Sequence, residues 1–196
     1  MELDSPSQVH PAGAHIGYLF RDDEERRDVI RAFVRGGLNA GELVAYYADV
    51  REPELNHALE ELGVLPVDEA HRHQLVTAPA ASAYFPEQRF VPEHTLALVL
   101  DYYERGRRDF HNGARVVGEM SWASRGVPGS EQLTEYECRL NGLIAEHPVT
   151  VLCEYDMRCF DGPACFTALG LHPMLVIRGR IVPNPYLDAP GAPQWP

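Results

Sequence analysis

The 196-residue sequence lacks any apolar run of the length needed to span a bilayer, and residues 1–11 show neither the basic nor the apolar region of a signal peptide. These absences predict a cytoplasmic protein. Positive charge is also scarce, because 17 basic side chains face 29 acidic ones and give a net charge of -12. Such a chain repels phosphate backbones and anionic lipid headgroups, so we expect no direct binding to nucleic acid or membrane.

Familiar catalytic and nucleotide-binding motifs are missing as well. The sequence contains no Gly-x-Ser-x-Gly, no His-Glu-x-x-His and no Gly-x-Gly-x-x-Gly. A phosphate loop needs glycines, a lysine and a hydroxyl after the first strand, but residues 21–27 read Arg-Asp-Asp-Glu-Glu-Arg-Arg. We therefore expect no ATP and predict no cofactor, while a bound metal stays an open question.

Cysteine usage gives no clear site either. The four cysteines, Cys138, Cys153, Cys159 and Cys165, include no Cys-x-x-Cys pair, which fits reduced thiols in a cytosol. The spacing of the last three is compatible with a metal cluster. The alternative is that they are small buried apolar side chains.

The chain is of the right length for one domain, and its apolar pattern alternates between strands and helices. Strands are predicted at residues 14–20, 42–48, 74–78, 114–120, 149–155 and 174–177, and helices at about 23–40, 53–62, 92–110, 133–144 and 161–170. Residues 79–91 are predicted to form a surface loop. This alternation indicates an α/β three-layer sandwich with a mostly parallel sheet over residues 14–186, with flexible ends at 1–13 and 187–196.

In such sheets, ligands bind where loops and helix N-termini meet the carboxyl ends of the strands. That rule selects residues 21–24, 48–51, 119–122 and 155–158, including Asp156. Glu119 and Trp122 at one strand end could hold a small organic molecule, together with Tyr155 and the Tyr84-Phe85 loop. The alternatives are that Glu119 pairs with an arginine or caps a helix, and that Trp122 covers the core.

Further polar residues share faces of predicted elements. Glu137 and Asn141 are four residues apart on one helix, and Cys153 and Tyr155 alternate onto one face of a strand. Helix-to-loop hydrogen bonding would explain the first pair equally well. His15 and His172 stand at strand starts, where they could be core residues, or could join Cys153 and Glu119 in a metal site if the fold brought them together.

Seven segments in order form a pattern over residues 14–186. They are His15-Ile-Gly-Tyr-Leu-Phe, Gly37-Leu-Asn-Ala-Gly-Glu, Gly118-Glu-Met-Ser-Trp, Tyr136-Glu-Cys-Arg-Leu-Asn, Cys153-Glu-Tyr-Asp, His172-Pro and Asn184-Pro-Tyr. Together they resemble the MEDS domain, the sensory domain of methanogen and methylotroph DcmR-type proteins. The layout also looks like a RecA or KaiC core without the phosphate loop (Walker A), with Glu119 where those ATPases hold a magnesium-binding acid.

The resemblance implies a sensory domain of prokaryotic signal transduction that detects small hydrocarbon derivatives. Its partner would be a kinase, an anti-sigma factor or a transcription regulator. The family's polar positions fall on His15, Glu119, Trp122, Glu137, Asn141, Cys153, Tyr155 and His172. We therefore expect a non-enzymatic ligand sensor. The rivals are a metalloprotein or enzyme that uses His15, Glu119, Cys153 and His172, and a degenerate ATPase-like docking scaffold that could act as a homo-oligomer.

Overall fold

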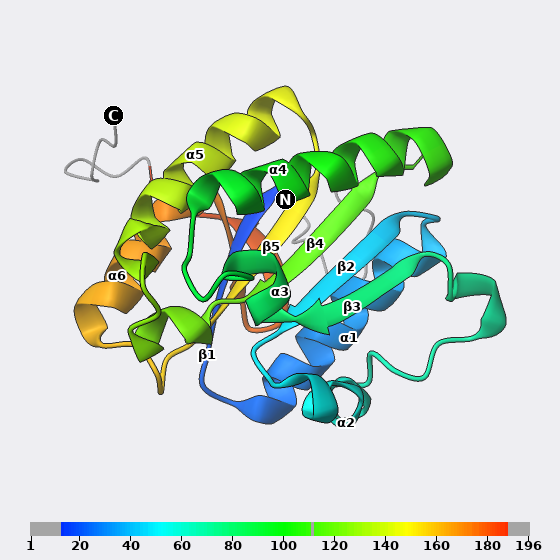
Figure 1. Cartoon of the computed structure of the whole chain (residues 1–196), viewed down its shortest axis with the longest axis horizontal. Helices are drawn as coiled ribbons and strands as arrows, with labels where there is room; N and C mark the ends of the chain where they lie inside the picture. Colours follow the sequence, from blue (N-terminus) through cyan, green and yellow to red (C-terminus); the bar gives the residue numbers. More distant parts are fainter. Residues whose placement is uncertain (1–12, 111, 188–196) are drawn as a thin grey trace.

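The computed structural model describes residues 13–110 and 112–187 (Figure 1). Within these residues, one sheet of seven strands has the order β3-β2-β4-β5-β1-β6-β7. The strands are β1 His15–Phe20, β2 Leu43–Ala48, β3 Leu75–Pro79, β4 Ala114–Glu119, β5 Thr150–Asp156, β6 Met174–Ile177 and β7 Arg180–Pro183. All neighbours pair in parallel except β6 and β7. The predicted mostly parallel α/β sheet is confirmed.

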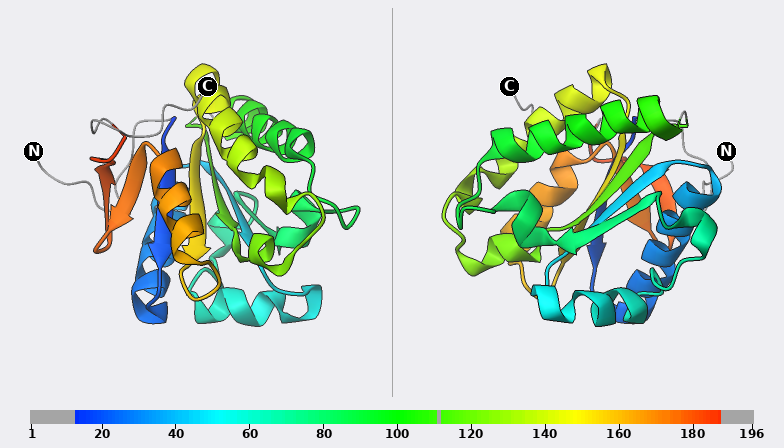
Figure 2. Two further views of the ribbon diagram at one scale, coloured as in Figure 1. Left: turned by 90° about the vertical axis from the view of Figure 1, so that its left-hand side faces the viewer. Right: turned by 45° about the vertical axis from the view of Figure 1, so that its right-hand side comes forward.

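Helices cover both faces of this sheet, as Figure 2 shows. The α-helices are α1 Asp23–Asn39, α2 Leu55–Glu61, α3 Ala80–Tyr84, α4 Pro92–Arg105, α5 Leu133–Glu146 and α6 Gly162–Leu171. Helices α1 and α2 pack on one face, with a core that includes Phe33 and Leu59. Helices α3 to α6 pack on the other, around a core that includes Trp122 and Leu140. Among the described helices, none is both long and apolar enough to cross a membrane.

Local sequence signals explain the first β-α unit. All six residues of β2 are buried, as expected for a parallel strand covered on both faces. The side chain of Asp22 caps helix α1 by accepting a hydrogen bond of 2.7 Å from the backbone N–H of Glu25. Beyond the end of the helix, Gly41 takes a φ of 74°, a left-handed conformation that favours glycine.

Two segments differ from the sequence prediction. The segment 79–91, predicted as a loop, begins with the short helix α3, which the run of alanines at Ala80 and Ala81 favours. Strand β7 is not predicted at all. It forms a hairpin with β6 through Arg178 and Gly179, which both have positive φ angles. The proposed flexible ends, 1–13 and 187–196, fall almost wholly outside the described residues.

The strand order places a topological switch point between the adjacent strands β1 and β5. From β1 the chain crosses to β2 on one side, whereas from β5 it crosses to β6 on the other side. Adjacent parallel strands whose connections leave in opposite directions separate the loops at their carboxyl ends. Residues at the ends of β1, β4 and β5 therefore meet at the place where this architecture commonly binds ligands.

Candidate functional site

Four side chains of metal-ligating types converge in the core between the sheet and helix α5. His15 begins β1, Cys153 lies within β5, Glu137 lies on α5 and His172 follows α6. One potential metal-binding atom from each lies within 4.8 Å of all the others, and all four residues are buried. We call these four residues the buried quartet.

The distances within the buried quartet are short. Glu137 Oε2 lies 3.1 Å from His15 Nε2 and 3.6 Å from His172 Nε2. Cys153 Sγ lies 3.6 Å from both His15 Nε2 and Glu137 Oε2. The second carboxylate oxygen, Glu137 Oε1, accepts a hydrogen bond from the hydroxyl of Tyr155. One carboxylate oxygen is thus held by Tyr155, and the other faces both imidazoles and the thiol.

Outer hydrogen bonds fix the two imidazole rings. The side-chain amide of Asn141 donates to Leu171 O at 2.8 Å, so its oxygen faces His15 Nδ1 at 2.9 Å and accepts a hydrogen bond from it. His172 Nδ1 donates to Ala168 O at 2.7 Å. Both rings therefore carry their proton on Nδ1 when neutral, and both Nε2 lone pairs point at the quartet.

Protonation within the quartet follows from burial. Burial, aided by the nearby His15, lowers the pKa of His172 to about 4 and keeps its ring neutral at pH 7. Burial and the neighbouring Glu137 carboxylate raise the pKa of Cys153 well above its usual value. Burial opposes ionisation of Glu137, but proximity to His172 and His15 and the hydrogen bond from Tyr155 outweigh it and lower its pKa. The thiol is thus protonated, and the carboxyl is ionised.

A missing side chain makes room for His172. Gly17 pairs with Cys153 across β1 and β5. A Cβ atom on Gly17 would lie 2.8 Å from His172 Cγ, closer than real Cβ contacts. The imidazole of His172 therefore occupies the space that a side chain at position 17 would fill.

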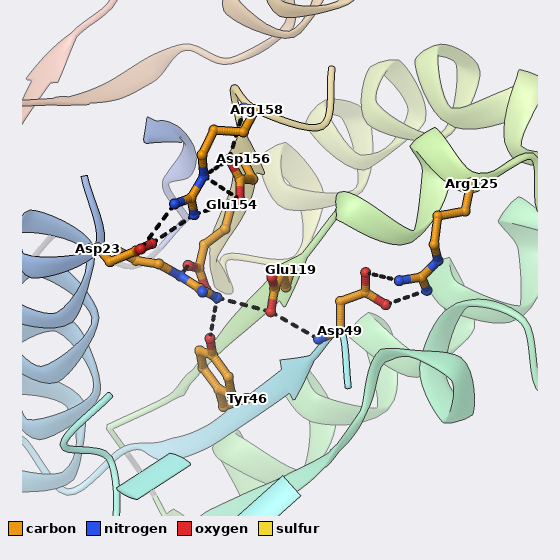
Figure 3. A network of polar contacts seen from close by, with 9 residues as sticks. Asp23, Tyr46, Asp49, Glu119, Arg125, Glu154, Asp156 and Arg158 are labelled. Carbon is orange, nitrogen blue, oxygen red and sulfur yellow. Dashed lines mark hydrogen bonds and ion pairs between the residues drawn. The ribbon is translucent and has the colours of Figure 1, made fainter. Parts of the chain in front are cut away.

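A second polar network lies at the carboxyl edge of the sheet (Figure 3). Arg26 of α1 contacts Glu154 at 2.8 Å, Glu119 at 2.9 Å and the Tyr46 hydroxyl at 3.2 Å. Glu119 also accepts a hydrogen bond of 2.9 Å from the backbone N–H of Asp49. We call Arg26, Glu119 and Glu154 the edge network.

Around this network lie exposed ion pairs that tie neighbouring loops together. Arg158 bridges Asp156, at the end of β5, to Asp23 in the first turn of α1. Arg125 forms two hydrogen bonds of 2.6 Å with Asp49. Glu119 therefore pairs with arginine, one of the alternatives that the sequence leaves open, and the structure separates it from the metal candidates His15, Cys153 and His172.

The predicted aromatic residues do not line one common cavity. Trp122 and Tyr84 are buried and stack with ring centroids 5.2 Å apart, so Trp122 covers the core. Phe85 lines a separate hollow of about 820 Å³ beside Asp49 and Arg125. Glu119 lines another, of about 370 Å³, beside α1 and α2. Of the predicted pocket residues, Tyr155 alone lines the cavity next to the buried quartet.

This cavity, of about 500 Å³, lies between α6, the start of α5 and the turn before it. We call it the Tyr155 cavity. Its apolar lining includes Leu133, Phe160, Ala164, Ala168 and Leu171, and its polar lining includes Ser130, Thr134 and Thr167. This volume is typical of small-molecule sites, and the mixed lining suits a compact organic molecule with one or two polar groups.

Sequence reasoning missed Arg26, Glu154 and the α6 side of the Tyr155 cavity. Glu154 alternates with Cys153 and Tyr155 on a strand whose other residues are mostly apolar. A charged side chain on the opposite face of such a strand needs a buried partner of opposite charge. Glu154 in the sequence therefore indicates a buried ion pair. The only nearby clue to the partner is that Arg26 follows four acidic residues, the cap Asp22 and the first three residues of α1.

Fold and site define a mostly parallel α/β core whose carboxyl edge holds an acidic helix start and an arginine-carboxylate network. A family model described as "MEDS: MEthanogen/methylotroph, DcmR Sensory domain" matches residues 14–173. The chain therefore belongs to the MEDS family of sensory domains.

A curated relative supports a signalling role. The chain is 23% identical over 159 residues to the transcriptional repressor DcmR of Methylorubrum extorquens, a match that covers 81% of this chain and 57% of the repressor. The chain thus spans little more than half the length of that relative. Family and relative together indicate a sensory role in regulation.

Two solved structures support the fold. The flagellar accessory protein FlaH from Methanocaldococcus jannaschii matches with a TM-score of 0.54 at 13% identity, covering 84% of this chain and 70% of that one. The KaiC-like protein PH0186 from Pyrococcus horikoshii OT3 matches with a TM-score of 0.55 at the same identity and coverage. The KaiC-like fold is confirmed.

We predict that this chain does not bind ATP with magnesium. Phosphate binding would use the N-terminus of α1, but the Asp22 carboxylate already caps it, and three further acids follow in the first turn. The sequence contains no lysine to contact a phosphate. Calorimetric titration should give no measurable heat of binding at millimolar ATP, and micromolar affinity would contradict this prediction.

Proposed function

We propose that this domain binds a small organic molecule in the Tyr155 cavity, leaves it chemically unchanged, and signals to a partner regulator in the cytoplasm. One observation carries the proposal: Tyr155 lines the cavity and also donates a hydrogen bond from its hydroxyl group to Glu137. Ala168 has a similar double role, because it lines the cavity and its backbone carbonyl accepts a hydrogen bond from His172 Nδ1. An occupant that shifts α6 or Tyr155 would therefore disturb the buried quartet.

The chemistry of the quartet favours sensing over catalysis. A nucleophilic cysteine needs a lowered pKa and access to its substrate. Cys153 has neither, since burial raises its thiol pKa and the side chain is fully buried. His15 and Glu137 are equally enclosed. These properties support a non-enzymatic role.

The output partner would be a kinase, an anti-sigma factor or a transcription regulator. The relation to a transcriptional repressor supports this class of partner. The net charge of -12 argues that any contact with DNA is made by a partner or by another domain. The small molecule would be a simple hydrocarbon derivative such as an alcohol, an amine or a halocarbon, which suits the mixed apolar and polar lining of the Tyr155 cavity.

We expect a screen of small alcohols, amines and halocarbons to identify a compound that stabilises the folded chain. Present at 100 times its Kd, a compound that binds only the folded state adds about 2.7 kcal/mol, which raises the Tm of a chain of this size by roughly 5–10 °C. Thermal melting followed by fluorescence measures the shift. An unmoved Tm across the screen would count against the proposal.

A pair of matched variants locates the site. Ala164→Leu should fill the Tyr155 cavity and abolish the Tm shift, because Ala164 lines it. Ala81→Leu makes the same change in the separate hollow beside Phe85 and should leave the shift intact. If Ala81→Leu removed binding and Ala164→Leu did not, the ligand would lie at the Phe85 hollow and our assignment of the cavity would be wrong.

A further inference from the structure

We propose that His15, Glu137, Cys153 and His172 bind one Zn²⁺ ion through their Nε2, Oε2, Sγ and Nε2 atoms. This inference does not depend on the proposed function, since a zinc-free chain could still bind a ligand in the Tyr155 cavity. Two nitrogens, one sulfur and one carboxylate oxygen form a donor set that tetrahedral zinc accepts.

The spacing of the donor atoms matches a tetrahedral ion. Bonds of about 2.0–2.3 Å to zinc place neighbouring ligand atoms roughly 3.3–3.8 Å apart. Of the six donor–donor separations within the buried quartet, one is 3.1 Å and three are 3.6 Å, and the other two, from His172 to His15 and to Cys153, are within 4.8 Å. A shift of His172 by about 1 Å or less would bring its Nε2 atom to the spacing of a tetrahedral site.

Each donor is also oriented as a metal ligand. Zinc-binding histidines usually donate their other ring N–H to a carbonyl or carboxylate, and ligating carboxylates are themselves hydrogen-bonded. Here Asn141 holds His15, the carbonyl of Ala168 holds His172, and Tyr155 holds Glu137. All three outer contacts turn the remaining donor atom toward the same point.

Without an ion, this arrangement leaves polar atoms poorly satisfied. His172 Nε2 is fully buried and has no hydrogen-bond partner among the described residues. The neutral tautomer of His15 aims a lone pair at the carboxylate oxygen of Glu137, 3.1 Å away. Two lone pairs facing each other in a dry core repel, and a cation between them removes the repulsion.

The charge balance favours a divalent ion. On binding, the Cys153 thiol loses its proton to solvent and becomes a thiolate. Zn²⁺ with one thiolate, one carboxylate and two neutral imidazoles has no net charge, which lowers the cost of burial. Nitrogen and sulfur donors exclude magnesium and calcium, and four protein ligands leave no open position for catalysis.

The ion would connect β1, β5, α5 and the junction of α6 with β6, since each supplies one ligand. It would therefore stabilise the side of the sheet that carries the Tyr155 cavity. We expect chelation to lower the Tm of the purified chain and zinc to restore it. Zinc uptake should release about one proton per chain, from Cys153.

The decisive experiment uses the full chain without a histidine tag, grown with added zinc. We expect about one zinc per chain by mass spectrometry, and X-ray absorption showing one sulfur at about 2.3 Å with nitrogen and oxygen at about 2.0–2.2 Å. Replacement by Co²⁺ should give the visible bands of a tetrahedral site and a thiolate charge-transfer band. These measurements need no variant, so they hold even if a substituted chain fails to fold.

Variants then assign the ligands. Cys153→Ala should lose the charge-transfer band and the zinc, whereas Cys159→Ala, an exposed cysteine, should keep both. Asn141→Leu should weaken zinc binding by about 10–100-fold, because it removes the contact that orients His15. Folded wild-type chain that takes up neither zinc nor cobalt, or folded Cys153→Ala with unchanged zinc content, would overturn the proposal.

Discussion

Replacing Arg26 with methionine is expected to cost about 3–5 kcal/mol of unfolding free energy at pH 8, because it leaves a buried carboxylate without its partner. Glu154 is fully buried, and Arg26 contacts it at 2.8 Å. Glu119 contacts the same guanidinium at 2.9 Å, so both carboxylates lose their cation together. Chemical denaturation followed by tryptophan fluorescence measures the loss.

The loss of unfolding free energy in Arg26→Met should increase as pH rises. Burial already raises the pKa of Glu154 despite the attraction of Arg26, and removal of Arg26 raises it further. A carboxyl group with a raised folded-state pKa weakens the fold as pH rises above its unfolded pKa, about 4.3. The Arg26→Met deficit should therefore be smaller at pH 5 than at pH 8.

Two further variants make this test specific. Glu154→Gln added to Arg26→Met should recover part of the stability and remove most of the pH dependence. Arg31→Met, which breaks an exposed pair with Asp28 on the same helix, should cost less than about 0.5 kcal/mol. A loss under about 1 kcal/mol for Arg26→Met at pH 8 would mean that the edge network is not buried as described.

Gly118→Ala is expected to cost about 3 kcal/mol, at the upper end of the range for overpacked cores. A Cβ at this position would lie 1.8 Å from the hydroxyl oxygen of Tyr84. The Tyr84 ring has little room to move, because it packs against Trp122, Phe90 and Tyr136. Denaturation curves compare the variant with the wild type.

Two further variants distinguish the clash with Tyr84 from a general effect of replacing glycine by alanine. Tyr84→Phe in the Gly118→Ala background removes the hydroxyl oxygen that meets the new methyl group and should recover part of the loss. Gly142→Ala changes an exposed glycine of α5 with no atoms near its Cβ position, and should stabilise the chain by about 0.5–1 kcal/mol. Equal losses at both glycines would contradict the packing described here.

Much of the fold can be predicted from the sequence, because the spacing of the apolar residues and the need to bury them allow few assignments of helices and strands. The strands of a parallel sheet covered on both faces are continuous apolar runs, such as β2 and β5, and caps such as Asp22 and Gly41 mark helix ends. Strand β7 escapes prediction because it has four residues, including an exposed arginine and a proline. Its only signal is the Arg178-Gly179 turn.

The sequence predicts the site only as separate pairs of residues, each pair on one face of a helix or strand. Periodicity places Glu137 with Asn141, and Cys153 with Tyr155, and in the structure these pairs do meet around His15 and the carboxylate of Glu137. Periodicity does not tell which face of α5 covers which strand. The sequence prediction places Glu119 with the two histidines, but the pairing of β1 with β5 beneath α5 brings Glu137 to them instead.

A crystal structure of the chain with the compound that raises its Tm most would test the central claim most directly. We predict density for the compound in the Tyr155 cavity, in contact with the ring of Tyr155 and the α6 side at Ala164. The edge network of Arg26, Glu119 and Glu154 should be unchanged. Density against Glu119 and Arg26 instead, with the Tyr155 cavity empty, would contradict the account.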